Sequence, residues 1–392
     1  MGLTRHELKS ISFLMPTRYV RELVFSVSSP SVNLLGMSRG ALERYFVERG
    51  ERPYRARQMM RWMYGRAIID PAQMTDLSVG LRASLMTTVD TELPRVKKLQ
   101  RATDGTLKWL LDIGGGQEIE TVYIPEPRRG TLCISSQAGC AMDCSFCATG
   151  KQGFNRNLSA AEIIGQIIVA RCALDSQTAA NGISNVVFMG MGEPLANLRE
   201  VAEVCDLLTD DFGLALSRRR VTVSTCGLVP QIARLAKLTN VALAVSLHAS
   251  DDELRDELVP INRRHPIKEL LAACWNYASE TRSREITFEY VMLDGVNDTP
   301  ADAARLAGLL AGKPAKVNLI PFNSFPGTIY QRSPQRVIDD FRQALLDRGI
   351  IAITRRTRGD DINAACGQLA GSIDNRVRIP MAQKSIHTVT HS

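Results

Sequence analysis

Apolar residues follow two alternating spacings from residue 131 onward. Short β-branched segments, typical of buried strands, alternate with longer segments whose apolar positions recur every three or four residues, as on one helix face. The predicted strands are 131–135, 185–190, 220–224, 241–247, 286–292, 316–320 and 351–355. The predicted helices are 158–173, 197–209, 229–238, 267–280, 300–311 and 333–348. This alternation predicts an α/β fold with a parallel sheet, and it is too short for eight units, so we predict an open, partial (βα)6 barrel.

The chain before the barrel has two other patterns. Strand-like segments at 105–113 and 118–126 flank three consecutive glycines and predict a β-hairpin, while residues 38–94 have helical patterns. We therefore expect five regions: an N-terminal extension of poor order (1–36), a small helical accessory domain (37–100), a hairpin extension (101–126), the barrel core (127–370) and a polar tail (371–392).

Arginines and aromatic residues alternate in the accessory domain. The arginines are Arg52, Arg55, Arg57, Arg61 and Arg66, and the aromatic residues are Tyr54, Trp62 and Tyr64. Arginines can bind phosphates and aromatic faces can stack on unpaired bases, which is one interpretation. The other is a helix whose aromatic residues are core and whose arginines face water.

Composition is that of an ordinary globular protein, since 45% of the 392 residues are hydrophobic and 23% are charged. No apolar run is long enough to span a bilayer and no signal-peptide layout is visible, so we expect no membrane association. Nine cysteines, an odd number and partly clustered, favour a reducing cytoplasm over a disulfide scaffold. The net charge of +7 favours a polyanionic partner.

Three of the nine cysteines form a compact C-x3-C-x2-C motif: Cys140, Cys144 and Cys147. Thiolates placed this closely are typical of ligands that share one metal centre. Three ligands suit a 4Fe–4S cluster with one open iron, whereas structural zinc takes four ligands and no close fourth is visible. Ordinary buried cysteines are a weaker interpretation because the loop lacks an apolar period.

The motif resembles that of the radical S-adenosylmethionine (SAM) enzymes. The longer string SSQAGCAMDCSFCATGKQGF, residues 135–154, resembles their RNA-methylating RlmN/Cfr family, and the resemblance extends over roughly residues 38–370. It implies a radical SAM barrel, an RNA-binding accessory domain, a 4Fe–4S cluster on the three cysteines, and two SAM molecules per turnover.

Further candidate residues follow the carboxyl ends of the predicted strands, where the active sites of such barrels gather. The resemblance implies that the following residues contact SAM: Gly192, Glu193, Ser224, Ser246, Leu247, His248 and Asn323. By themselves, Gly192 and Ser246 are more commonly turn and strand-end residues, and a lone histidine is more often a satisfied core residue. The family usually has VSTSG, whereas this chain has Cys226 in place of the second serine.

Two cysteines outside the motif bear on the type of reaction. From the residues alone, Cys133 and Cys366 could be buried hydrophobes, although Cys366 follows the last predicted strand on the same rim. The resemblance implies that Cys366 takes a methyl group from one SAM and that a radical derived from a second SAM removes hydrogen from it. The methylene carbon then joins adenine C2, Glu120 is the family's proton acceptor, and Cys133 releases the RNA through a disulfide.

The resemblance also implies substrates and partners. We expect adenine-C2 methylation of 23S rRNA at the peptidyl-transferase centre and of tRNA next to the anticodon, an electron-donating flavodoxin-type reductant, and a monomer. Two alternatives stay open: a C8 methyltransferase from the same family, and a non-catalytic iron–sulfur RNA-binding protein. The second leaves Glu193, His248 and Cys366 without a role.

Overall fold

The computed structural model describes residues 32–175, 182–283, 285–369 and 371. Most of the expected N-terminal extension (1–31) and of the expected polar tail (372–392) lies outside the described residues. None of the helices in the described ranges is both long and apolar enough to cross a membrane.

A ten-stranded sheet forms the centre of the molecule, in the order β14-β13-β12-β11-β10-β9-β6-β5-β4-β3. Its seven parallel strands are β6 (Arg129–Cys133), β9 (Ile183–Phe188), β10 (Val221–Thr225), β11 (Ala242–Ser246), β12 (Ile286–Met292), β13 (Ala315–Pro321) and β14 (Ile351–Thr354). These strands confirm the seven predicted ones to within two residues at each end. The sheet has two different edge strands, β14 and β3, so the barrel is open, as predicted.

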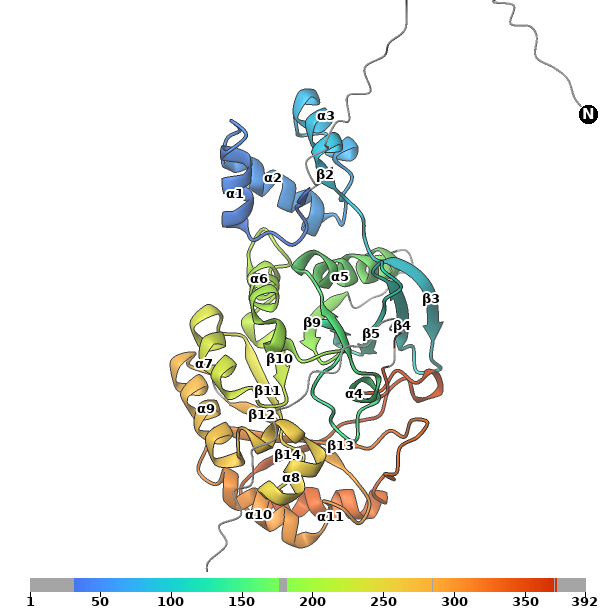
Figure 1. The fold of residues 1–392 in the computed structure, drawn as a ribbon, viewed down its shortest axis with the longest axis vertical. Coiled ribbons are helices and arrows are strands. Elements are labelled where there is room, and N and C mark those ends of the chain that lie inside the picture. Colours follow the sequence, from blue (N-terminus) through green and yellow to red (C-terminus); the bar gives the residue numbers. More distant parts are fainter. Residues whose placement is uncertain (1–31, 176–181, 284, 370, 372–392) are drawn as a thin grey trace, which may run out of the picture.

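The six predicted barrel helices are present and cover the outside of the sheet (Figure 1). They are α5 (Ala160–Asp175), α6 (Leu198–Thr209), α7 (Val229–Leu238), α9 (Ile267–Glu280), α10 (Pro300–Leu310) and α11 (Gln335–Leu346). Their local signals are strong: α10, for example, begins with a capping box between Thr299 and Asp302. The short helix α8 (Asp252–Leu258) was not predicted, because its sequence DELRDEL is almost wholly polar.

The predicted hairpin is confirmed and is part of a larger unit. Strands β4 (Leu107–Asp112) and β5 (Glu118–Glu126) are antiparallel, and β5 continues into the barrel by pairing with β6. A third strand, β3 (Arg95–Arg101), adds to the edge of β4 and was not predicted, because its RVKKLQR sequence has an exposed, basic pattern.

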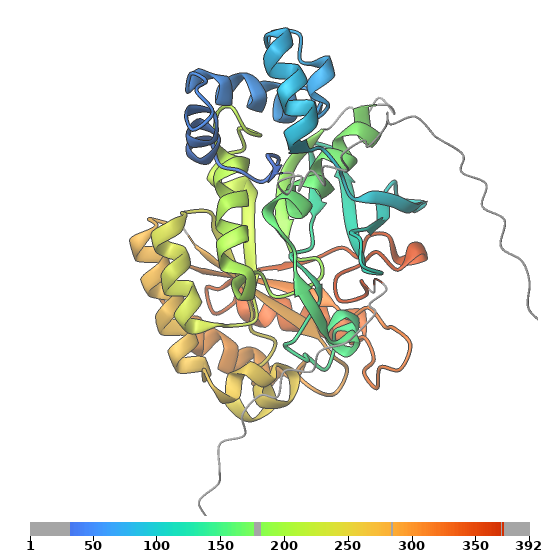
Figure 2. The ribbon, with the colours of Figure 1, turned by 45° about the horizontal axis from the view of Figure 1, so that its top comes forward.

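The accessory domain lies at the end of α6, where it forms a helical unit above the sheet (Figure 2). It contains α1 (Arg39–Val47), α2 (Tyr54–Met60), a π-helix (Arg61–Gly65) and α3 (Val79–Thr88). Strand β1 (Val32–Asn33) pairs with β2 (Val89–Asp90), so residues 32–33 belong to this unit and not to a poorly ordered extension.

The base-stacking interpretation is wrong for two aromatic residues of this domain. Trp62 and Tyr64 are only 6% and 1% exposed, and Trp62 Nε1 donates to Asp76. These rings are core, whereas Tyr54 is exposed. The exposed guanidinium groups of Arg57 and Arg61 lie 5.6 and 5.4 Å from the Phe212 ring of the barrel, at the junction between the two units.

Candidate active site

One cavity at the carboxyl ends of the parallel strands collects most of the predicted site residues. Its lining includes Cys140, Cys144, Cys147, Gly190, Gly192, Glu193, Ser224, Ser246, His248, Asn323 and Cys366. These residues follow six different strands, so the fold brings together positions that are more than two hundred residues apart in sequence. The convergence of polar groups in one cleft is typical of a ligand-binding site.

The cysteine motif occupies a loop whose base is closed by short strands. Strands β7 (Gln137–Gly139) and β8 (Phe154–Asn157) pair, and the Cys140 N–H donates to Gly153 O at 2.8 Å. Cys147 directly precedes helix α4 (Ala148–Gln152). Burial is the main cause that raises the pKa of each of the three thiols. Repulsion from the other motif thiols adds to it for Cys140 and Cys144, and repulsion from Cys366 adds to it for Cys147.

This donor set fits an iron–sulfur cluster. Three soft sulfur donors face one cavity, and a bound cation would stabilise them as thiolates against the effect of burial. Within the described residues, no three His, Cys, Asp or Glu side chains are grouped tightly enough to hold a single metal ion. Ligands that each bind a different iron of a cluster do not need such tight grouping.

The Gly192–Glu193 turn is held rigidly against the cysteine loop. Gly192 has φ +98°, and a Cβ at this position would lie 2.5 Å from Gln137 Cβ, so only glycine fits. The buried Glu193 carboxylate accepts the backbone N–H groups of Leu195 and Cys226 at 3.0 and 2.8 Å. Burial raises the pKa of Glu193, and these hydrogen bonds partly oppose that shift. The 2.8 Å hydrogen bond uses the backbone N–H of residue 226. The presence of Cys226, where the family usually has a serine, therefore leaves this hydrogen bond intact.

The ends of β11 and β13 complete the cavity. His248 adopts φ +59°, its Nδ1 accepts the Val291 N–H at 3.0 Å, and burial lowers the pKa of its imidazole to about 3. The ring is therefore neutral, with its proton on Nε2. Leu247 does not line the cavity, since its side chain packs in the main hydrophobic core. Asn323 Nδ2 donates to Cys366 O at 3.4 Å.

The two remaining predicted cysteines meet at a second, smaller cavity. Cys133, Cys366, Asn323 and Arg355 all line it. Arg355 Nη1 donates to Cys366 Sγ at 3.1 Å, which is a favourable arrangement for an anionic sulfur. Burial, reinforced by the charge of Cys366, raises the pKa of Cys133 to about 12. Cys366 thus borders both cavities, between the cysteine motif and Cys133.

The loop that carries Cys366 is tied to the hairpin on one side and to the cysteine loop on the other. The Gly359 N–H donates to Asp104 Oδ2 at 3.1 Å, and Lys108 Nζ donates to Asn363 O at 3.1 Å. On the other side, the Ala148 N–H donates to Gly367 O at 2.8 Å. These contacts explain why the hairpin extension packs beside the barrel.

Glu120 lies near this loop but lines neither cavity. Its carboxylate forms an ion pair with Lys108 at 2.9 Å, and both side chains are less than 9% exposed. Val122, two residues further along β5, does line the cavity beside Cys133. The role of Glu120 as a proton acceptor therefore stays a prediction.

Glu120→Gln is expected to destabilise the fold by about 3–5 kcal/mol, because it leaves the buried Lys108 ammonium without its carboxylate partner. The measurement is denaturant unfolding. Glu118→Gln on the same strand is the matched control: its partner Lys97 is half exposed, so a much smaller loss is expected. Equal stability of Glu120→Gln and the unsubstituted protein would contradict a structural role for the pair.

Two charged residues of the site were missed. Arg355 follows directly after β14, so the expectation that active-site residues follow the carboxyl ends of the strands could have identified it. Glu289 is a buried carboxylate in the middle of the apolar strand β12, and both of its oxygens accept from Asn318 Nδ2 at 3.1 and 2.9 Å. Burial raises the pKa of Glu289, and the charge of Arg355 opposes that shift. The sequence signal that could have identified Glu289 is a single carboxylate within an otherwise apolar predicted strand.

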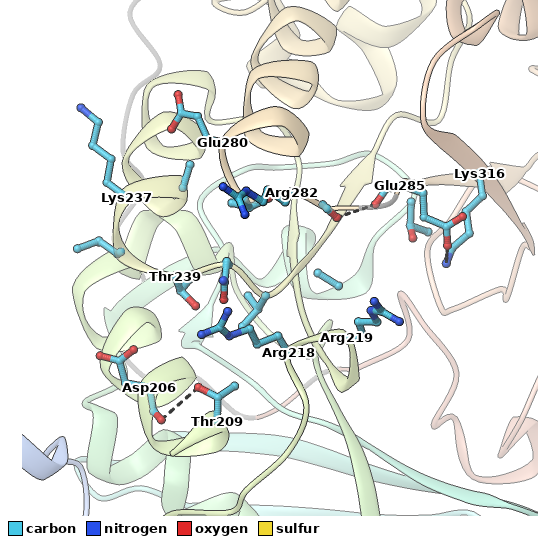
Figure 3. Close-up of a pocket in the computed structure, with 18 residues that line it drawn as sticks. Asp206, Thr209, Arg218, Arg219, Lys237, Thr239, Glu280, Arg282, Glu285 and Lys316 are labelled. Carbon is cyan, nitrogen blue, oxygen red and sulfur yellow. Dashed lines mark hydrogen bonds and ion pairs between the residues drawn. The ribbon is translucent and has the colours of Figure 1, made fainter. Parts of the chain in front are cut away.

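A larger cavity, of about 1090 Å³, lies at the opposite ends of the strands (Figure 3). Its lining includes Arg218, Thr239, Arg282 and Lys316. None of the predicted site residues lines it. Cavity size alone therefore does not locate the candidate active site.

The fold and the three-cysteine cavity define a radical SAM enzyme. The family model described as "Radical SAM superfamily" matches residues 134–307, and such enzymes use a 4Fe–4S cluster and SAM. The model "Ribosomal RNA large subunit methyltransferase N-terminal domain" matches residues 32–90. A crystal structure titled as a radical SAM methyltransferase from Sphaerobacter thermophilus is similar with a TM-score of 0.81 and 45% identity, covering 86% of this chain and 99% of that chain.

One curated relative identifies the branch. The dual-specificity RNA methyltransferase RlmN of Alkalilimnicola ehrlichii is 54% identical over 347 residues, which are 88% of this chain and 96% of the relative. This chain belongs to the RlmN family of radical SAM RNA methyltransferases.

Proposed function

We propose that the protein methylates C2 of adenosine in two RNAs: 23S rRNA at the peptidyl-transferase centre, and tRNA at the position 3′ of the anticodon. Its similarity to a dual-specificity RNA methyltransferase supports both substrates. The observation that carries the proposal is the position of Cys366, which borders the same cavity as Cys140, Cys144 and Cys147 although it lies more than two hundred residues away in sequence.

The first group of residues would hold the cofactors. Cys140, Cys144 and Cys147 would bind three irons of one 4Fe–4S cluster, which, with SAM on its open iron, supplies a radical that abstracts hydrogen. Glu193 would accept a hydrogen bond from the ammonium group of SAM. Gly192 lines the same cavity, and the remaining SAM contacts would come from Ser224, Ser246, His248 and Asn323. Leu247 lies outside the cavity lining, so its expected contact with SAM stays a prediction.

The second group would carry the methyl group. The Cys366 sulfur attacks the methyl carbon of one SAM, and S-adenosylhomocysteine leaves. After loss of one hydrogen, the sulfur-bound carbon joins adenine C2, and Glu120 would take the C2 proton. The Cys133 thiolate then attacks the Cys366 sulfur: the carbon–sulfur bond breaks, a disulfide forms, and the released carbon takes up a proton to become the methyl group. The unpaired electron left from the radical step would return to the cluster.

This scheme also implies partners. One electron primes the cluster and would be regained when the adduct is resolved, so each turnover consumes the two electrons that reduce the disulfide. We propose a flavodoxin-type reductant that primes the cluster. We propose that a monomer acts in the cytoplasm, in keeping with its cysteines, none of which forms a disulfide within the described residues.

The test is an anaerobic reaction of the full chain with 23S rRNA or tRNA fragments, SAM and reductant. We expect iron–sulfur absorbance, 5′-deoxyadenosine and 2-methyladenosine, measured by optical spectroscopy and nucleoside mass spectrometry. Formation of 8-methyladenosine instead would assign the C8 alternative. A colourless protein that contains zinc would overturn the proposal.

A further inference from the structure

Arg255 is a fully buried cation next to the candidate active site. Its side chain is 0% exposed and projects from α8. Nε donates to Leu247 O at 3.0 Å, and Nη2 donates to Ser246 O and Cys226 O at 3.0 and 2.8 Å. Nη1 donates to Asn262 Oδ1 at 2.7 Å. All four acceptors are neutral, so these bonds satisfy the donors of the guanidinium group but not its charge.

The charge of Arg255 has no direct protein partner in the part of the chain that the structure describes. No carboxylate there lies within 4.0 Å of its nitrogens. The cations that do form ion pairs, such as Arg39, Lys151 and Arg305, are 40–51% exposed, so water also solvates their charge. Glu193 accepts the N–H of Cys226, at the opposite end of the residue whose carbonyl binds Arg255. Asp252 and Asp256 are one hydrogen bond further out, where they accept from Asn262 Nδ2. A buried charge without a contacting counter-ion is costly, so a nearby anion would stabilise this position.

The position of Arg255 shows where such an anion would lie. Cys144 packs against the small hydrophobic cluster that contains Cys226 and Leu258, and Leu258 is the last residue of α8, the helix that carries Arg255. The Ser145 N–H donates to Leu258 O at 3.1 Å, which joins the cysteine loop to the end of α8. Cys226, whose carbonyl group accepts from Arg255 Nη2, lines the same cavity as Cys140 and Cys144.

We propose that Arg255 is the fixed counter-charge of the thiolate-bound iron–sulfur cluster and that it stabilises the reduced cluster. The inference rests on the proposed function. Reduction adds one electron to the cluster, so a nearby positive charge raises its reduction potential. The same side chain holds the carbonyl groups of Cys226, Ser246 and Leu247, and so couples the electrostatics of the cluster to the shape of the SAM site. Arg255 is a positioning residue, because its side chain does not line the cavity.

The experiment is a redox titration of the full-length holoprotein with dithionite and mediators, followed by electron paramagnetic resonance of the reduced cluster. Arg255→Gln removes the charge but retains an amide donor, and Arg255→Lys retains the charge. We expect the Gln variant to have a lower potential, equivalent to at least a tenfold shift toward the oxidised cluster, or about 59 mV for a one-electron couple. The Lys variant should stay close to the unsubstituted protein.

Arg171→Met is the matched control. Arg171 also donates only to carbonyl groups, those of Tyr64 and Gly65, but it lies at the junction with the accessory domain. We expect its substitution to leave the potential unchanged. A second measurement is the rate at which a chelator removes iron, which should increase several-fold in Arg255→Gln and not in Arg171→Met.

Each outcome separates the inference from the function on which it rests. If the unsubstituted protein forms no cluster, the proposed function fails. If it forms a cluster and makes 2-methyladenosine, but Arg255→Gln has an unchanged potential and iron loss, only the counter-charge role fails. If the Gln variant folds by circular dichroism and takes up no cluster, whereas the Lys variant does, the role is supported.

Discussion

Cys366→Ala is expected to abolish RNA methylation while the protein still takes up its cluster and SAM. Cys366 is the sulfur that borders both cavities and receives the hydrogen bond from Arg355, so its removal eliminates the proposed carrier of the methyl group. A loss of at least about 10³-fold is expected, as for other covalent nucleophiles. The measurements are the yield of 2-methyladenosine and the mass of the peptide that contains residue 366, which should no longer gain a methyl group.

Cys172→Ala is the control for this variant. Cys172 is an exposed thiol on α5 and lines neither cavity, so its substitution should leave methylation unchanged. Normal iron content in both variants would show that the loss lies in the chemistry and not in cluster assembly. Full activity of Cys366→Ala would refute its role as methyl carrier.

Cys133→Ala is expected to accumulate protein covalently joined to RNA. Cys133 lines the small cavity with Cys366, from which it can attack the sulfur that holds the RNA. Without this thiol, the final carbon–sulfur bond has no nearby nucleophile to break it. The adduct is measured as a band of reduced mobility on a denaturing gel, and it should disappear after ribonuclease treatment.

The double variant Cys133→Ala/Cys366→Ala is the control, because it lacks the sulfur that forms the adduct. It should give no shifted band. Rapid release of methylated RNA by Cys133→Ala, with no trapped species, would count against Cys133 as the resolving thiol.

The release step is also expected to depend on pH. Burial is the largest cause that raises the pKa of Cys133, and it persists in the adduct, where the alkylated Cys366 sulfur carries no charge; most of the Cys133 thiol is therefore protonated at neutral pH. Only the thiolate attacks, and its fraction rises with pH until the pKa is reached. When release limits the reaction, adduct in the unsubstituted protein should therefore decay faster at pH 9 than at pH 7, as followed by quenched-flow gel analysis.

The sequence predicted the barrel because its signals are local. The segment ITFEYVM carries its strand period within seven residues, and α10 carries its own capping box. Cys366 and Asn323 follow predicted strands, and the carboxyl ends of parallel strands lie at one edge of the sheet. Their position at that edge could therefore be predicted from the sequence.

What could not be predicted depends on contacts that are distant in sequence. Lys108 and Glu120 meet only because β4 and β5 pair in one particular register. The amphipathic ring of Trp62 suits either base stacking or a hydrophobic core, so the sequence alone does not distinguish the two. In the fold its Nε1 donates to Asp76, and the ring lies in the core. Arg255 lies in a segment of charged residues, which predicts an exposed helix. Its burial depends on strand ends from distant parts of the sequence, which exclude water from its side chain.

The two anchors around Cys366 limit how far its sulfur can travel. Asn363 O and Gly367 O are held from opposite sides, by Lys108 and Ala148. The three residues between these anchors can extend over about 10 Å at most. The proposed methyl carrier is therefore on a short segment of chain, and we expect that the target base must leave its stack and enter the protein to meet it. RNA helices that cannot release the base would be excluded as substrates by distance alone.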